Sequence, residues 1–120
     1  MVDPTSSARI VLTTASNPDE ANHLGRTLVE ERLAVCATLI PAVESIYRWK
    51  GKLETSSETL LMLKTGSEQI AALDARLHQL HSYETPEFLV LPVEAGSHAY
   101  LEWMFSGLTS GHRPDAQDPK

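Results

Sequence analysis

The sequence predicts an α+β fold, in which two helices cover one face of a four-stranded antiparallel sheet. Two observations lead to this fold class. The elements follow the order strand, helix, strand, strand, helix, strand, and the two middle strands form an unusually long hairpin. With 120 residues, the chain is long enough for one core. We expect one domain over residues 9–108, a flexible N-terminus over 1–8 and a disordered tail over 109–120.

The N-terminal half begins with a strand and a helix. Arg9 to Ala15 is rich in β-branched residues and ends at turn formers, which predicts a strand. A capping asparagine, a proline in the first turn and a regular apolar stripe then predict a helix over about Pro18 to Glu31. The segment from Ala34 to Thr65 is predicted to form the hairpin, with a tight turn at Lys50 and Gly51.

The C-terminal half repeats the order of helix and strand. A second helix is expected to start at Thr65 or Ser67, because apolar residues follow at helical spacing. The fourth strand is expected over Glu87 to Val93, and a third helix from near Ser97. The order is that of the split βαβ, or ferredoxin-like, arrangement, to which the C-terminal helix is an addition.

Composition narrows the function classes. Acidic residues outnumber basic ones by 16 to 10, and a net charge of −6 disfavours nucleic acid as a partner. No secretory signal and no membrane-spanning stretch is evident, so we expect a cytoplasmic protein without membrane contact. The single Cys36 excludes an internal disulfide and favours a buried structural thiol. We expect no enzyme, because the nucleotide, hydrolase and metalloprotease motifs are missing.

The hairpin is predicted to be longer than the domain that carries it. An arm of about 14 residues extends roughly 45 Å, whereas a domain of about 100 residues is about 30–35 Å across. Ile46, Tyr47 and Trp49 near its end are too apolar to stay bare in water, and Pro41 predicts a bulge or a change of pairing partner. We expect a homo-oligomer formed by strand exchange. A hairpin bent over its own core is the alternative.

Four polar residues around the end of the second helix form a candidate metal site. His78 and His81 are three positions apart on one predicted helix face, and Glu84 and Glu87 follow within reach of a folded loop. Imidazoles and carboxylates suit copper, zinc or another divalent metal. The alternative is that the histidines interact with the helix dipole and the carboxylates are only solvated.

Aromatic residues form a second candidate group. Five of the seven lie in the hairpin tip, in the loop before the fourth strand or in the third helix: Tyr47, Trp49, Tyr83, Tyr100 and Trp103. Their expected role is packing at an interface. They are also suited to line a small-ligand cleft beside Lys64 and Glu87.

Three runs of residues resemble the CutA divalent-cation-tolerance family: CATLIPAVESIYRWKGKLE, YETPEFLVLPV and YLEW. The resemblance extends over about Arg9 to Leu108. It implies a ferredoxin-like protomer in a compact homotrimer, with strands of the long hairpin completing neighbouring sheets. It also implies a link to tolerance of copper and other divalent metals, chiefly in the cytoplasm, with no established enzymatic activity.

The family's pattern can be followed residue by residue. Its matching positions, which lie near subunit contacts in the family, are Tyr47, Trp49, Gly51, Lys52, Tyr83, Pro86, Glu87 and Trp103. Members proposed to bind copper can carry a cysteine in the first strand and a histidine pair before the TPE loop. Thr13 and Leu80 take two of those places here, while His81 and Glu87 remain. The resemblance therefore implies a weaker nitrogen and oxygen site, helped by Glu84 or His78.

Three functions remain open from the sequence. The first is a trimer that binds divalent metal in clefts between subunits. The second is a signalling or adaptor trimer that resembles PII-type proteins, with Lys64, Arg48 and Tyr83 contacting a small anionic effector. The third is a structural trimer without a dedicated ligand.

Overall fold

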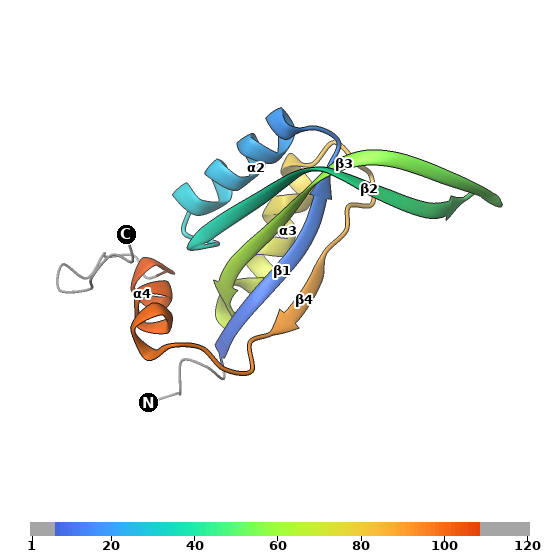
Figure 1. Cartoon of the computed structure of the whole chain (residues 1–120). Helices are drawn as coiled ribbons and strands as arrows, with labels where there is room; N and C mark the ends of the chain where they lie inside the picture. Colours follow the sequence, from blue (N-terminus) through green and yellow to red (C-terminus); the bar gives the residue numbers. More distant parts are fainter. Residues whose placement is uncertain (1–6, 109–120) are drawn as a thin grey trace.

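The computed structural model describes residues 7–108, which form a four-stranded antiparallel sheet in the order β2-β3-β1-β4 (Figure 1). Helices α2 and α3 lie on one face of this sheet. The elements are β1 (Ala8–Ala15), α2 (Pro18–Glu30), β2 (Cys36–Trp49), β3 (Lys52–Gly66), a 3₁₀ turn (Ser67–Gln69), α3 (Ile70–Leu80), β4 (Leu89–Pro92) and α4 (His98–Leu108). The predicted ferredoxin-like α+β arrangement is confirmed.

Local chemistry sets the helix start and the hairpin turn as the sequence predicts. The Asn17 side chain accepts a hydrogen bond from the backbone N–H of Glu20 at 2.8 Å, and a proline occupies the first turn of α2. At the hairpin turn, Lys50 and Gly51 have φ values of 50° and 79°. Left-handed residues at both central positions match the twist of the two strands, so the turn keeps them paired.

Several predicted boundaries need correction. The second helix does not start at Thr65 or Ser67, because Thr65 still pairs with Arg9 of β1 and a 3₁₀ turn comes before α3. The last strand is shorter than predicted and covers only Leu89–Pro92. Strand β1 begins at Ala8, which is fully buried. The residues expected to be flexible or disordered, 1–6 and 109–120, lie outside the described part of the chain.

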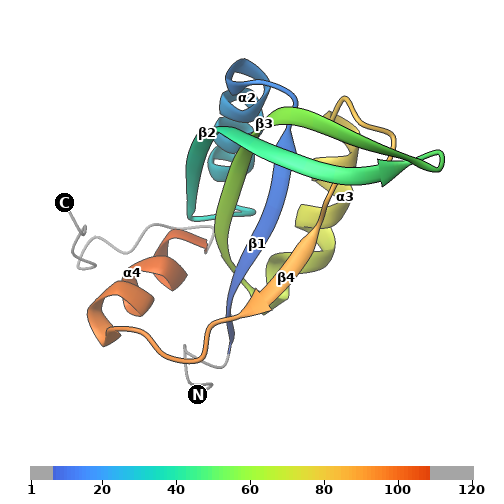
Figure 2. The same cartoon turned by 45° about the vertical axis from the view of Figure 1, so that its right-hand side comes forward.

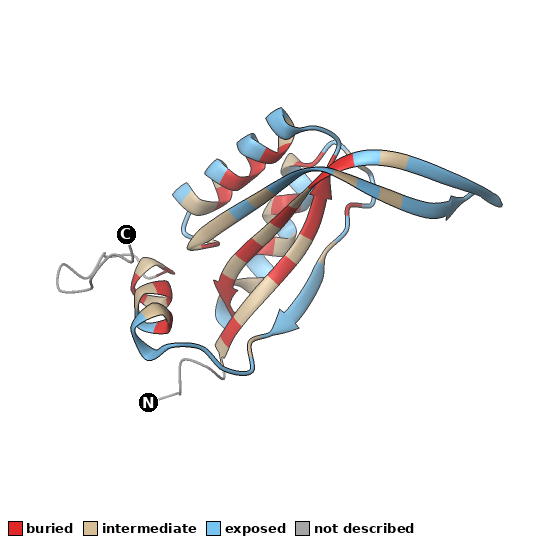
Figure 3. Cartoon of the chain, viewed as in Figure 1, coloured by how far each residue is buried: buried red, intermediate tan, exposed pale blue. Residues whose placement is uncertain are grey.

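The main core lies between the sheet and the two helices (Figure 3). Its largest fully buried side chains are leucines from α2, β3 and α3: Leu24, Leu28, Leu61, Leu63, Leu73 and Leu77. Gly25 lets α2 approach β2 closely, since a Cβ at this position would lie 3.1 Å from the Cβ of Ala37. The helices are therefore held on the sheet by apolar burial over a short interlayer distance.

The opposite face of the sheet is apolar and only partly covered. Cross-strand partners share a face, and the register places on this one Ile10, Leu12, Ile40, Leu60, Met62, Leu89 and Leu91. Helix α4 packs at one end of the sheet through Ala8, Leu101 and Met104. Farther along, Ile40, Leu89 and Leu91 remain 42%, 56% and 44% exposed. We call the seven residues the open face.

The hairpin extends past the end of the sheet, as predicted (Figure 2). The register shifts between Ile40 and Val43, so Pro41 marks a bulge, and Ala42 has a φ of 60°. Beyond it the hairpin extends away from the domain and does not fold back over its own core, and the molecule measures 51 × 26 × 26 Å. Ile46, Trp49 and Leu53 are 63%, 60% and 71% exposed.

Two threonines of β3 give a matched test of buried polar groups. The Thr59 hydroxyl is buried and has no hydrogen-bond partner within residues 7–108, whereas the equally buried Thr65 hydroxyl donates to the Leu33 carbonyl at 2.7 Å. We expect Thr59→Val to raise the free energy of unfolding by about 1 kcal/mol, and Thr65→Val to lower it by about 1–2 kcal/mol. Urea unfolding measures both. Equal losses in the two variants would contradict the assignment.

Candidate functional site

His81 connects the end of α3 to the end of β1. It terminates the helix with an extended backbone, and its side chain is fully buried. The ring Nδ1 accepts a hydrogen bond from the Tyr83 backbone N–H at 3.0 Å. The proton must therefore be on Nε2, which donates to the Thr14 carbonyl at 2.7 Å. Both ring nitrogens are engaged, so the imidazole has a structural role within the chain.

Glu20 holds the same loop from the other side. One carboxylate oxygen accepts from the Ser82 backbone N–H at 2.9 Å, and the other accepts from the Ser16 backbone N–H and hydroxyl at 3.1 and 2.9 Å. Burial alone would raise the pKa of Glu20, but these hydrogen bonds outweigh it and lower the pKa to about 2. The group is therefore a carboxylate at neutral pH and accepts all of these hydrogen bonds.

Tyr83 joins the loop to the hairpin. Its hydroxyl donates to the Glu58 carboxylate at 2.8 Å, and its ring lies 4.7 Å from the His81 ring. Burial and the negative charge of Glu58 raise the pKa of Tyr83 well above its usual value. The phenol therefore stays protonated and acts as a donor. Glu58 is itself buried, and it pairs with Val43 at the first position beyond the bulge.

The four predicted metal ligands do not converge. His78 is exposed, and its Nδ1 lies 2.9 Å from both the carbonyl and the carboxylate of Asp74. The expectation that it shares a helix face with His81 is not met, because the helix ends first and the His81 ring turns inward. Glu84 and Glu87 are exposed. Within residues 7–108, no three His, Cys, Asp or Glu side chains are placed to hold a metal ion together.

The predicted ligand-cleft residues do not all lie together. Arg48 pairs across the hairpin with Leu53, which is 11 positions from Lys64 on β3. Along the strand, Arg48 and Lys64 are therefore roughly 36 Å apart. The Lys64 ammonium lies 5.9 Å from the ring of Tyr100 and donates to the Cys36 sulfur at 3.8 Å. Cys36 is partly buried, which corrects the expected full burial of this thiol. Trp49 lies on the exposed hairpin, whereas Tyr83 of the loop is near enough to Tyr47 for Tyr47 to contribute, after burial and Glu58, to the raised pKa of Tyr83.

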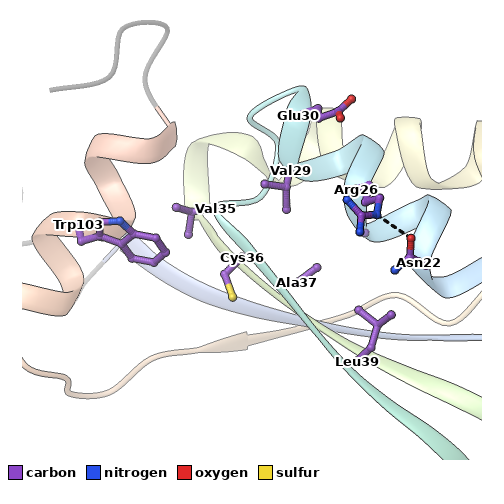
Figure 4. A pocket seen from close by; sticks show the side chains of 10 residues that line it. Asn22, Arg26, Val29, Glu30, Val35, Cys36, Ala37, Leu39 and Trp103 are labelled. Carbon is purple, nitrogen blue, oxygen red and sulfur yellow. Dashed lines mark hydrogen bonds between the residues drawn. The ribbon is translucent and has the colours of Figure 1, made fainter. Parts of the chain in front are cut away.

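A cavity of about 420 Å³ lies elsewhere, between α2, the start of β2 and Trp103 of α4 (Figure 4). Its walls are mostly apolar, and the Arg26 Nε donates to the Asn22 side chain at 2.7 Å on one side. The cavity follows the outer edge of the sheet, where β2 has no further strand beside it within the described chain. It includes Trp103 from the predicted cleft residues and none of the predicted metal ligands.

Comparison with known proteins identifies the family. The sequence profile of the CutA1 divalent ion tolerance protein family matches residues 9–106. The chain belongs to this family. The resemblance seen in the hairpin and loop motifs is thereby confirmed.

Curated relatives agree with this assignment. A divalent-cation tolerance protein CutA from Pectobacterium atrosepticum is 43% identical over 105 residues, which are 88% of this chain and 96% of the relative. Protein CutA from Homo sapiens is 44% identical over 98 residues, which are 82% of this chain. The chain spans only 55% of the human protein.

Solved structures of the family have the same fold. CutA from Xylella fastidiosa has a TM-score of 0.84 at 36% identity and covers 87% of this chain and 100% of its own. CutA1 from Oryza sativa has a TM-score of 0.85 at 32% identity, and the match covers 91% of this chain and 100% of the rice chain. The sheet, the long hairpin and α4 therefore belong to the family architecture.

The relatives occur in several compartments. One from Arabidopsis thaliana is named chloroplastic, and one from Archaeoglobus fulgidus is named periplasmic. No helix within residues 7–108 is long and apolar enough to cross a bilayer. Family membership alone therefore does not fix where this chain acts.

Sequence reasoning missed two carboxylates of this site. In the sequence Glu20 is one acidic residue of the first turn of α2, whereas in the structure its carboxylate binds a residue 62 positions later in the chain. Glu58 gave no signal at all. It follows the polar run Thr55, Ser56 and Ser57, so nothing in the sequence distinguishes it from a solvated residue of the strand.

The low pKa of Glu20 predicts a pH-dependent contribution to stability. Its ordinary pKa of 4.5 falls to about 2 on folding, so the contribution is complete above about pH 5 and is lost as the pH falls toward 2. We expect Glu20→Gln to lower the free energy of unfolding by about 1–2 kcal/mol at pH 7, with a smaller deficit at pH 3. Urea unfolding at both pH values tests this. A deficit that does not change with pH would contradict it.

Proposed function

We propose that this protein is a cytoplasmic homotrimer that contributes to divalent metal tolerance, chiefly of copper, and binds the metal weakly in clefts between subunits. The observation that carries the proposal is the bare apolar surface of the hairpin and the open face. Three further points rest on the family resemblance: that the assembly has three subunits, that the protein acts in the cytoplasm, and that it has no enzymatic activity.

Burial supports the assembly. Ile46, Trp49 and Leu53 are each at least 60% exposed on the hairpin, and Leu89 and Leu91 on β4 are about half-exposed. A two-stranded hairpin has too little apolar contact of its own to remain stable in water. Covering these residues with another copy removes apolar surface from water on both partners.

The two sheet edges support a ring rather than a two-fold dimer. β2 and β4 are the outer strands of the sheet, and both present unpaired backbone groups along apolar segments. Pairing of one edge with the other edge of a second copy is a head-to-tail contact, and such contacts form a closed ring when the rotation between copies closes. The number of three copies follows the family resemblance.

A charge on the hairpin tests the assembly. We expect the parent protein to sediment at three times the 13.2 kDa chain mass. Ile46→Glu should shift it toward monomers, because the carboxylate would be buried unpaired between copies. The matched control is Ala75→Glu on the exposed surface of α3, which should stay trimeric. A parent that sediments as a monomer at micromolar concentration would refute the proposal.

Metal binding is proposed at the loop between α3 and β4. Glu84 and Glu87 are exposed there and form no ion pair within residues 7–108. His81 does not fit a metal as it stands, because both of its nitrogens are already bonded. Two carboxylates alone hold a divalent ion weakly, so donors from a second subunit would complete the coordination.

Calorimetry with copper tests this assignment. We expect Glu87→Gln to weaken Cu²⁺ binding by the trimer about three- to tenfold, because a charged oxygen ligand is lost. Glu94→Gln is the matched control, since this carboxylate is also exposed but lies outside the loop. Unchanged affinity in Glu87→Gln would remove the loop from the proposed site.

A further inference from the structure

A continuous series of hydrogen bonds runs from the central strand to the hairpin. The Thr14 carbonyl binds the His81 ring, the His81 ring accepts from the Tyr83 backbone, and the Tyr83 hydroxyl binds Glu58. Glu20 fixes the loop from α2 through the Ser82 backbone N–H. We call Glu20, His81, Tyr83 and Glu58 the loop network. Its members come from α2, the α3–β4 loop and β3, with β1 as its anchor.

The network meets the hairpin where the hairpin loses its other support. Strand β1 ends at Ala15, opposite Thr59, so residues 52–58 of β3 have no β1 partner. Among these residues Glu58 lies next to the end of β1. It pairs with Val43, and this is the first pair of the hairpin beyond the bulge. A bulge bends the strand that carries it and increases the local twist, so a contact beside it acts where the hairpin changes direction. The Tyr83 contact at 2.8 Å acts at this bend.

We infer that Tyr83 is a positioning residue for subunit assembly, and that its hydrogen bond to Glu58 fixes the direction in which the hairpin leaves the sheet. This inference rests on the proposed trimer. The exposed Ile46, Trp49 and Leu53 lie on the hairpin beyond the bulge, and Trp49 is six positions past Val43. A small change of angle at the bulge therefore displaces these side chains by several ångströms and misaligns them with a second copy.

The chain offers matched variants for this test. Tyr83→Phe removes only the hydroxyl that binds Glu58. Tyr47→Phe removes the other phenol of this region, whose hydroxyl bonds Ser56 within the hairpin itself at 3.2 Å. Glu58→Gln keeps an oxygen that accepts from Tyr83, whereas Glu58→Ala removes it.

The direction of the hairpin is measured first. Nitroxide labels at Lys52 and Glu68, in a Cys36→Ser background diluted with unlabelled protein, report the distance between the hairpin turn and the domain by double electron–electron resonance. We expect Tyr83→Phe and Glu58→Ala to broaden the distance distribution about twofold or more, because the bend loses the hydrogen bond that joins it to the loop. Tyr47→Phe and Glu58→Gln should retain the parent width.

Assembly is measured second, by sedimentation equilibrium at several concentrations. We expect Tyr83→Phe to raise the trimer dissociation constant about tenfold or more, because association must then also fix the direction of a hairpin that the hydrogen bond no longer holds. The double variant Tyr83→Phe, Glu58→Ala should be no weaker than Glu58→Ala alone, because both remove the same contact.

The outcomes separate this inference from the proposed function. A trimeric parent with unchanged distances and assembly in Tyr83→Phe overturns the inference and leaves the trimer intact. A monomeric parent overturns the proposed function, and the distance measurement then still decides whether the hydrogen bond fixes the bend. Equal effects of Tyr83→Phe and Tyr47→Phe would also overturn the inference, because a general loss of polarity would explain both.

Discussion

The rest of the structure depends on the mismatch in length between the hairpin and its neighbour strand. β3 has 15 residues and pairs with the eight residues of β1 only from Thr59 to Gly66. The remaining hairpin has only itself to pair with, and isolated two-stranded hairpins are marginally stable. The bulge, the contact between Tyr83 and Glu58 and the exposed apolar side chains all lie in or beside this unsupported part. These three features share one cause, because this segment requires support from outside its own sheet.

Much of this architecture could be predicted from the sequence because it rests on local rules. Asn17 and Pro18 predict a helix start. Lys50 and Gly51 predict a tight turn, and Pro41 predicts an interruption of strand pairing. Each is a signal within a few residues, and the structure confirms all three. The length of the hairpin, compared with the size of the domain, was also enough to predict that it would extend beyond the sheet.

The site could not be predicted in the same way, because its contacts join distant positions. Spacing placed His78 and His81 on one helix face, which assumed that the helix continues through both. The helix ends at Leu80, and His81 turns inward to a carbonyl 67 positions earlier. Glu20 and Glu58 likewise find partners 62 and 25 positions away. Sequence periodicity does not show contacts between distant positions. The histidines and glutamates therefore predicted a metal-binding cluster that the backbone does not form.

The loop network also decides which groups a metal ion can use. A metal could bind His81 only after the imidazole gives up two hydrogen bonds, and each buried group left unpaired costs about 1–3 kcal/mol. Glu84 and Glu87 are exposed and carry no such penalty. Their loop is held from both sides, through the Ser82 backbone and the Tyr83 hydroxyl. A weak site is therefore expected to use the carboxylates, while the histidine that looks like the best ligand in the sequence holds them in place.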